Sequence, residues 1–396
     1  MLRLRTLWLT AHRWFALSLG WVLAIMGITG ALLMIARPLD EHLHSELFRV
    51  TAHEQMSSVP LESVRQRFTA EFGKRAALSF RPPRVADESL RVTVHGRWNG
   101  IVYVDPFTGN ELGRRAETEG FVNVVFKLHS SLWMGSTGKA ILAFVALIYL
   151  LLLISGLVLW WPRSGKPNLR IELRKGLSRA LYDLHRVGGA SLGILIAFSI
   201  LTGAYMAWRP LGGFVTTLSG VRPMHAPVLP PESKPPRPTL PLDTLVARAQ
   251  AQFPHATIGL VQFPAQPAAA LRVRLKLPDD PHPNGLSSVW IDQFTGDVLA
   301  ARRWDALDPG ARAVAVVYPL HTGELGGPLL ESLFALGGLV LAALTTTGIW
   351  QWWRRRKART TQGHRESDTA SYAKRDHAAM SVVGEDRGTT PPSHTR

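Results

Sequence analysis

The 396-residue sequence predicts an α-helical membrane protein, in which four transmembrane helices arise from a tandem duplication and carry two small α+β domains outside the lipid. Three observations support this fold class: four long apolar runs, an internal repeat, and basic residues gathered on one side of the runs. A helix needs about 20 mostly apolar residues to cross a bilayer. The runs are approximately Trp14–Ala36, Ala140–Trp161, Val187–Trp208 and Leu329–Trp353.

The first and third runs repeat each other at an offset of 173 residues, and the second and fourth at an offset of 192. Both copies run in the same direction, which predicts a pseudo-two-fold axis along the membrane normal. The first offset matches His12 with His185, Arg13 with Arg186, Gly20 with Gly193, Thr29 with Thr202 and Gly30 with Gly203. The second matches His129 with His321, Gly135 with Gly327 and Gly156 with Gly348.

The segments that connect runs one to two and three to four also resemble each other. Each begins with an amphipathic helix after a proline, continues with alternating strands, and reaches an Asp-x-x-Thr-Gly turn. We therefore expect each segment to form one helix on a short antiparallel sheet. The predicted divisions of the chain are 1–36, 37–138, 139–161, 162–186, 187–209, 210–328, 329–353 and 354–396.

The net charge of +16 is distributed as a membrane protein requires, which excludes a nucleic-acid partner. Lysines and arginines precede run one, fill the short loop 162–186 and follow run four. This positive-inside pattern places both termini in the cytoplasm and both soluble domains on the opposite side. The first run is too long for the apolar part of a cleaved signal peptide, so we expect a retained anchor.

Two stretches have compositions that predict an extended or disordered chain. Pro223–Pro241 is rich in proline and predicts a linker into the second soluble domain. From Thr360 onward the chain is polar with almost no large apolar residues, which predicts a disordered tail. Cysteine is absent, which excludes disulfides, iron–sulfur clusters and a c-type haem attachment motif.

Four histidines occupy equivalent positions in the repeat. A helix rises about 1.5 Å per residue, so the two membrane faces lie roughly 33 Å apart along a helix of ~22 residues. His12 can therefore pair with His185 near one face, and His129 with His321 near the other. Two imidazoles on facing helices are suited to hold one metal or haem iron.

Several alternatives remain open for these sites. Zinc usually needs three or four protein ligands, for which Asp183 and Glu324 are the nearest candidates. His44 and His225 are alternative ligands for the outer site. Arginine suits carboxylates, so Arg13 and Arg186 are candidates to bind haem propionates.

The paired histidines, the two Asp-x-x-Thr-Gly turns and the sequence from Leu320 to Gly327 resemble the PepSY-associated transmembrane proteins of bacterial inner membranes, over about residues 5 to 356. The resemblance implies PepSY folds for the soluble domains. It also implies two b-type haems with His12, His129, His185 and His321 as axial ligands, and reduction of ferric siderophores.

Three functions are compatible with this sequence: a haem-bearing reductase, a regulatory or binding protein whose soluble domains restrain a protease or sense a ligand, and a permease. Paired histidines at two depths favour the reductase. No acidic residue or lysine lies in mid-span, which argues against a proton-coupled permease. No Gly-x-Gly-x-x-Gly motif stands between a strand and a helix, so electrons must come from a separate donor, either a membrane quinol or a soluble reductase.

Overall fold

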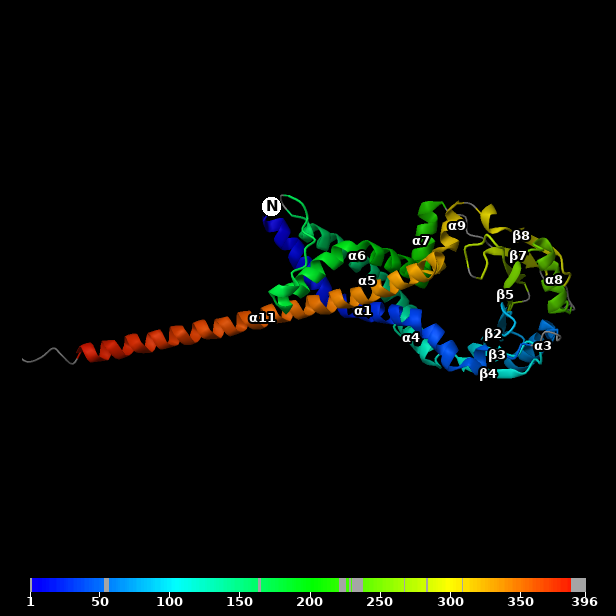
Figure 1. The fold of residues 1–396 in the computed structure, drawn as a ribbon, viewed down its shortest axis with the longest axis horizontal. Coiled ribbons are helices and arrows are strands. Elements are labelled where there is room, and N and C mark those ends of the chain that lie inside the picture. The colour runs from blue at the N-terminus through cyan, green and yellow to red at the C-terminus, as the bar shows by residue number, and fades with distance from the viewer. Residues whose placement is uncertain are drawn as a thin grey trace, which may run out of the picture.

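The computed structural model describes residues 2–52, 57–162, 165–220, 226–227, 229, 238–266, 268–282, 284–307 and 309–385. Within these residues, four helices are long and apolar enough to span a membrane (Figure 1). Each of the four apolar runs lies in one of them. The helices are α1 (Leu2–Leu43), α5 (Gly135–Trp160), α6 (Leu177–Ala207) and α11 (Gly327–Glu385).

The four helices form a bundle in which α1 packs against α5 and α11, and α6 packs against the same two helices. Close backbone approach is visible where α1 meets α11, because a Cβ added to Gly27 would collide with the carbonyl of Gly338. Small residues allow such approach where lipid supplies no hydrophobic driving force. The bundle core is built from Val22, Leu23, Val145, Tyr149, Ile196, Ala197 and Leu341.

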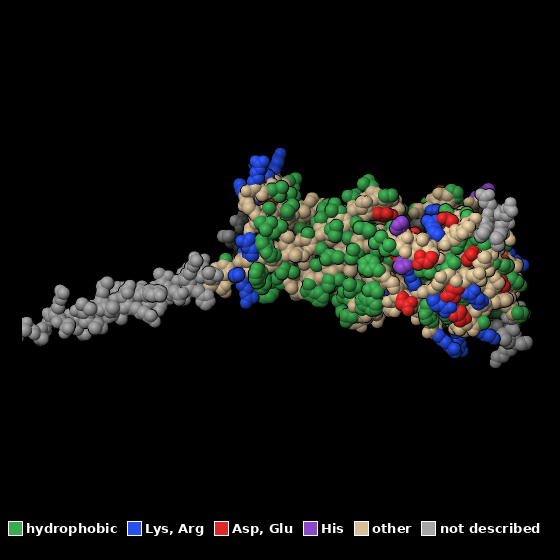
Figure 2. All heavy atoms as spheres, turned by 60° about the horizontal axis from the view of Figure 1, so that its bottom comes forward, with side chains coloured by type: hydrophobic (Ala, Val, Ile, Leu, Met, Phe, Trp, Pro, Cys, Tyr) green, Lys and Arg blue, Asp and Glu red, His purple; other side chains and the backbone are tan. Residues whose placement is uncertain are grey.

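The outside of the bundle is apolar. Large side chains such as Trp14, Phe144, Ile194 and Leu339 are exposed on it. Figure 2 shows this hydrophobic surface between a basic end and the mixed-charge surface of the sheet region. An exposed apolar surface of this extent fits a lipid environment.

The two soluble segments contribute four strands each to one antiparallel sheet. The strands are β1 (Ala77–Arg81), β2 (Leu90–His95), β3 (Gly100–Val104), β4 (Glu111–Ala116), β5 (Thr257–Phe263), β6 (Leu271–Lys276), β7 (Ser287–Ile291) and β8 (Val298–Arg302). Their order is β4-β3-β2-β1-β5-β6-β7-β8. The halves meet where β1 pairs with β5, with Leu78 opposite Phe263 and Phe80 opposite Val261. We expected two separate sheets, whereas the structure joins them at their edges, and this removes two unpaired strand edges.

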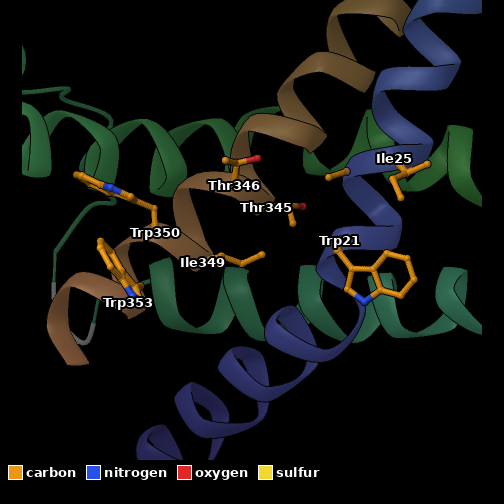
Figure 3. Close-up of a pocket in the computed structure, with 8 residues that line it drawn as sticks. Trp21, Ile25, Thr345, Thr346, Ile349, Trp350 and Trp353 are labelled. Atoms are coloured by element: carbon orange, nitrogen blue, oxygen red, sulfur yellow. The ribbon is translucent and has the colours of Figure 1, made fainter. Parts of the chain in front are cut away.

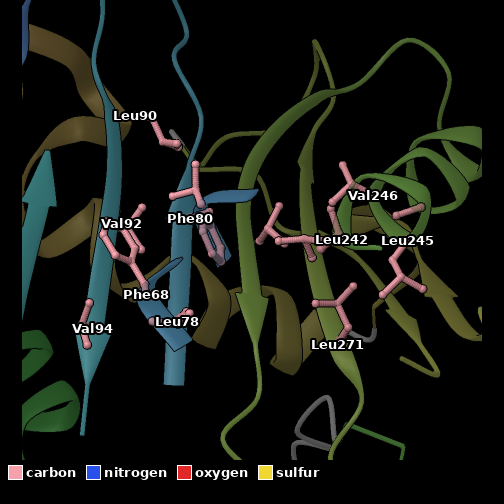
Figure 4. Close-up of a cluster of buried hydrophobic side chains, with 14 of the residues drawn as sticks. Phe68, Leu78, Phe80, Leu90, Val92, Val94, Leu242, Leu245, Val246 and Leu271 are labelled. Atoms are coloured by element: carbon pink, nitrogen blue, oxygen red, sulfur yellow. The ribbon is translucent and has the colours of Figure 1, made fainter. Parts of the chain in front are cut away.

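Helices α3 (Leu61–Phe72) and α8 (Leu242–Gln252) cover the face of the sheet that points away from the bundle (Figure 1). Alternate strand residues point toward these helices and form one continuous core across both halves (Figure 4). Phe68, Phe80, Leu242 and Leu271 are fully buried in it. The other alternate residues of each strand therefore face the bundle.

Short helices and 3-10 turns link the long elements of the chain. They are α2 (Ser45–Phe48), α4 (Phe121–Ser131), α7 (Arg209–Ser219), α9 (Pro309–Ala315), α10 (Val317–His321), and the 3-10 turns η1 (Leu173–Lys175), η2 (Trp304–Ala306) and η3 (Glu324–Gly326). At the sheet end of the bundle, α4 packs on α1, and α10 packs on α6. This arrangement places the C-terminal turns of α4 and α10 beside the membrane helices.

The region after the fourth span differs from the prediction. We expected disorder from Thr360, whereas α11 continues as one helix to Glu385. Extending an existing helix avoids the cost of a new nucleus, and residues 360–385 contain no proline and many good helix formers. Residues 386–396 and most of the predicted linker Pro223–Pro241 lie outside the described residues.

Candidate functional site: two imidazole pairs at opposite ends of the bundle

The structure brings His12 together with His185, and His129 together with His321. The ring centres are 6.4 Å apart in the first pair and 6.2 Å apart in the second. The two pairs lie at opposite ends of the bundle, since His12 and Gly30, which contacts His129, are separated along α1 by about 27 Å at the standard helical rise. Each pair takes one histidine from each half of the chain.

We call His12 and His185 the inner pair. Both of its rings are held by hydrogen bonds at Nδ1. His12 Nδ1 lies 2.8 Å from Ser155 Oγ on α5, and His185 Nδ1 lies 2.9 Å from the carbonyl oxygen of Leu344 on α11. The Ser155 hydroxyl donates its own proton to the Leu151 carbonyl at 2.6 Å, so it accepts the hydrogen bond from His12. Both rings therefore carry their proton on Nδ1.

We call His129 and His321 the outer pair. Its rings are also held by hydrogen bonds at Nδ1, which go to residues of helices α1 and α6. His129 Nδ1 lies 3.0 Å from Thr29 Oγ1, and that hydroxyl donates to the Ile25 carbonyl at 2.7 Å. His321 Nδ1 lies 2.9 Å from the carbonyl oxygen of Ser199 and 3.2 Å from Thr202 Oγ1. A carbonyl only accepts, so Nδ1 of His321 is protonated as well.

A glycine faces each of the four rings. A Cβ placed on Gly30 would lie 3.1 Å from Cε1 of His129, and one on Gly203 would lie 2.8 Å from Cε1 of His321. The inner rings have similar neighbours, at 3.5 Å for Gly156 with His12 and 3.3 Å for Gly348 with His185. In all four helices this glycine follows a hydroxyl residue, in the dipeptides Thr29-Gly30, Ser155-Gly156, Thr202-Gly203 and Thr347-Gly348.

The donor set fits a metal held between two imidazoles. With Nδ1 protonated and bonded, Nε2 of each ring keeps the lone pair that a metal needs. A metal about 2 Å from the nitrogen of each of two imidazoles places their ring centres roughly 6 Å apart. The spacing of both pairs therefore suits one six-coordinate iron each, with a macrocycle supplying the remaining ligands.

The zinc alternative finds less support. Among the described residues, no three side chains of His, Cys, Asp or Glu come together in a group that could hold a metal ion. Asp183 is fully buried, but it pairs with Arg179 at 2.8 Å and Arg186 at 3.2 Å. The carboxylate oxygen Oε2 of Glu324 is buried without a hydrogen-bond partner, and this residue has no equivalent in the first half.

The role predicted for the two arginines, binding of haem propionates, stays a prediction, and the structure shows their contacts within the chain. Arg186 donates to the carbonyls of Asn168 at 2.6 Å and Arg170 at 3.0 Å, so it holds the loop between α5 and α6. Within the part of the chain that the structure describes, its Nε has no hydrogen-bond partner. Arg13 is exposed, and its guanidinium lies 5.9 Å from the centre of the Trp14 ring. Neither arginine approaches an imidazole pair through a contact in the described residues.

Of the two alternative outer ligands, His44 has other partners than the outer pair. His44 is half exposed and interacts with Glu46 at 3.3 Å and Asp40 at 3.8 Å. His225 lies outside the described residues. Sequence reasoning missed Ser155 and Leu344. The hydroxyl–glycine dipeptide, repeated in all four spans, was the signal that could have identified Ser155, whereas no sequence signal marks Leu344.

A surface groove lies between α1 and α11. Trp21, Ile25, Ile349, Trp350 and Trp353 line it (Figure 3). Its two threonines, Thr345 and Thr346, donate their hydroxyl protons to carbonyls of their own helix. The groove thus presents mostly carbon to the lipid and holds no group for metal or proton chemistry.

Outside the membrane spans, burial and like charges perturb three groups on or beside the sheet. Burial, together with the cations Arg274, Lys276, Arg84 and Arg81, lowers the pKa of His282 to about 3. Burial, aided by neighbouring arginines, lowers the pKa of Arg81 and of Arg272 to about 10. These shifts show that several cations are partly buried close to one another.

Comparison with known families identifies the family of the chain. The model of the PepSY-associated TM region matches residues 9–355 of the chain. This range includes all four spans, both soluble segments and all four paired histidines. No curated protein sequence matches the chain.

Proposed function

Because the chain belongs to the PepSY-associated TM family, we propose that it is a haem-containing oxidoreductase that passes electrons across a bacterial inner membrane to a ferric siderophore. The observation that carries the proposal is the geometry of the two imidazole pairs. In each pair, both Nδ1 atoms are hydrogen-bonded, and the distance between the ring centres is about the one that a metal bound to both rings requires. A glycine lies beside every ring. A purely structural histidine needs none of this symmetry.

In this proposal, His12 and His185 hold one haem b, and His129 and His321 hold a second. Haem b supplies one-electron redox chemistry when it is bound. The carbonyls of Leu344 and Ser199 and the hydroxyls of Ser155 and Thr29 fix the tautomer and orientation of the rings. The four glycines keep Cβ atoms away from the rings.

The direction of transfer follows from the proposed topology. We propose a tandem duplication with both termini in the cytoplasm, because arginines and lysines cluster at the end of the bundle opposite the sheet (Figure 2). The sheet then lies in the periplasm, above the outer pair. An alkaline phosphatase reporter fused after Arg356 is expected to stay inactive. An active fusion would overturn the orientation.

The proposed acceptor is iron(III) held by a siderophore. Hard oxygen ligands bind iron(III) tightly, and one added electron gives iron(II), which they hold less strongly. Release therefore requires no covalent catalysis. The electron donor that balances this step is a membrane quinol or a soluble reductase on the cytoplasmic side.

The purified protein tests the proposal directly. We expect a Soret band that shifts on reduction with dithionite, and reoxidation of that band when a ferric siderophore is added after excess dithionite is removed. A colourless protein from haem-sufficient cells would favour the regulatory alternative. Haems that stay reduced with every chelate but reoxidise with quinone would place the electron flow elsewhere.

A further inference from the structure

The face of the sheet that points toward the bundle carries a row of arginines. Arg81 at the end of β1 lies directly opposite Arg91 on β2 in the register of the two strands. Arg272 and Arg274 occupy alternate positions on β6, each flanked by buried residues of the opposite face. Like charges directly opposite each other on a sheet are destabilising, so the fold maintains this row at a cost in stability.

This row lies against the outer end of the bundle. Arg91 pairs with Glu41 on α1 at 3.8 Å, and its guanidinium lies 5.5 Å from the centre of the Phe48 ring. Arg81 is close enough to Arg37 on α1 and Tyr318 on α10 to interact electrostatically with both. Tyr318 is one helical turn before the outer ligand His321. The arginines therefore lie at the end of the bundle that carries the outer imidazole pair.

The positive charge in this row is incompletely neutralised. Arg81 is partly buried, and among the described residues no carboxylate or carbonyl forms an ion pair or hydrogen bond with its guanidinium. Arg91 also pairs with Glu88, yet its Nε is buried without a partner. Arg274 donates to the Gly285 carbonyl at 3.0 Å and interacts electrostatically with Asp280. The Asp280 carboxylate already accepts hydrogen bonds from backbone amides.

The other groups that face this row do not supply a counter-charge. His282 stacks on Tyr318 with ring centres 5.7 Å apart and accepts a hydrogen bond from the amide of Asn284. Arg84 donates to the side-chain oxygen of Asn284, and Lys276 donates to the carbonyl of His282 at 3.2 Å. Arg81 is thus a partly buried cation without an anionic partner in the described residues, and Arg91 keeps one donor free, an arrangement that an anionic ligand would relieve.

We propose that the bundle-facing arginine row, defined as Arg81, Arg91 and Arg274 with Arg37 and Arg84 beside it, is a binding site for a soluble ferric chelate that carries free carboxylates. The planar guanidinium binds carboxylate oxygens in pairs, which a lysine cannot do. The place of the row at the outer end of the bundle would bring the chelated iron to the side of the protein where the proposed outer site lies. The inference rests on the proposed function only for what happens to the iron, and binding itself is independent of it.

A redox-inert probe separates binding from reduction. Gallium(III) citrate carries carboxylates and cannot be reduced under these conditions. Its affinity for the detergent-solubilised full-length protein is measured by isothermal titration calorimetry. We expect Arg81→Gln to weaken binding by at least about tenfold, as loss of a charge-assisted bidentate contact does. Arg81→Lys should recover only part of the affinity, because it keeps the charge but loses the paired geometry.

Lys74→Gln is the matched control, since Lys74 is an exposed cation in the turn before β1 and makes no ion pair in the described residues. Its affinity for gallium citrate should equal that of the wild type. Equal affinity in Arg81→Gln and the wild type, with both folded by their melting curves, would overturn the proposal. Competition by vesicles of an acidic phospholipid that depends on Arg81 would assign the row to lipid head groups and also overturn it.

A second measurement distinguishes this inference from the proposed function. The dithionite-reduced protein is mixed with ferric citrate or with a ferric trihydroxamate that has no free carboxylate. Arg81→Gln should slow reoxidation by ferric citrate and leave reoxidation by the trihydroxamate unchanged. Arginine-dependent gallium binding without any reoxidation would uphold the binding site and reject the reductase. Equal slowing with both chelates would reject carboxylate recognition and keep the reductase.

Discussion

Glu62 and Asp243 each cap the helix that carries the other. The Asp243 carboxylate accepts the backbone amides of Leu61 at 2.8 Å and Glu62 at 2.9 Å, and Glu62 accepts the amide of Leu242 at 2.9 Å. The two residues occupy matching positions, each two residues after the proline that precedes α3 or α8. Carboxylates at helix N-termini satisfy free amides and interact favourably with the helix dipole.

We therefore expect Asp243→Ala to lower the free energy of unfolding of the sheet region by about 1–2 kcal/mol, as loss of an N-terminal cap does. Susceptibility to limited proteolysis measures this. Asp87→Ala is the matched control, because it breaks only the exposed ion pair with Arg49 at 2.8 Å, and such pairs contribute little. Equal effects of the two substitutions would show that the reciprocal caps do not tie the halves together.

The glycines beside the rings make a second prediction. Gly203→Ala puts a Cβ 2.8 Å from the His321 ring, so the ring must move and the outer site should lose haem. Gly30→Ala leaves 3.1 Å and should have a smaller effect. Haem content and the width of the Soret band report both. Gly213→Ala in α7 meets nothing within 4 Å and serves as control. Full haem content in Gly203→Ala would show that haem binding does not require this glycine.

Replacement of the ligands tests the assignment of the pairs. His185→Ala should remove about half of the haem, because the inner pair loses a ligand while the outer pair keeps both. His321→Ala should remove the other half, and the pyridine haemochrome assay measures each. His255→Ala, in the turn before β5, should change nothing. Full haem in both ligand variants would rule out these histidines as ligands.

The buried His282 predicts a dependence of stability on pH. Its pKa falls from an ordinary value of 6.5 to about 3 on folding, so the unfolded chain binds more protons between these values. This contribution to stability is fully present above pH 6.5 and is lost as the pH falls toward 3. His282→Asn keeps an acceptor for the Asn284 amide and removes the titration. The melting temperature of this variant should fall less steeply from pH 7 to pH 5 than that of the wild type, and identical slopes would contradict the assignment.

The pairing of the histidines could be predicted from the sequence, because the length of each helix fixes how deep a residue lies in the membrane. This depth decides which of His12, His129, His185 and His321 can meet. The pairing of β1 with β5 could not be predicted from the sequence. Edge pairing between segments far apart in the chain depends on how two finished sheets are oriented, and no local pattern encodes that. Nor could it supply Leu344 and Ser199, whose carbonyls exist in every residue and become supports only through helix packing. The polar composition after Thr360 predicted disorder, but a helix that continues from the preceding span needs no new nucleus, and composition alone does not show this.

The distribution of each pair over both halves also sets an order of events during synthesis. The supports of the outer rings, Thr29 and Ser199, are both translated before His321, so this pair is complete when α10 leaves the ribosome. The inner ring of His185 waits longer, because its partner carbonyl at Leu344 lies in the last span. A chain that ended before α11 would therefore lack the carbonyl that supports the His185 ring, and its inner pair would be incomplete.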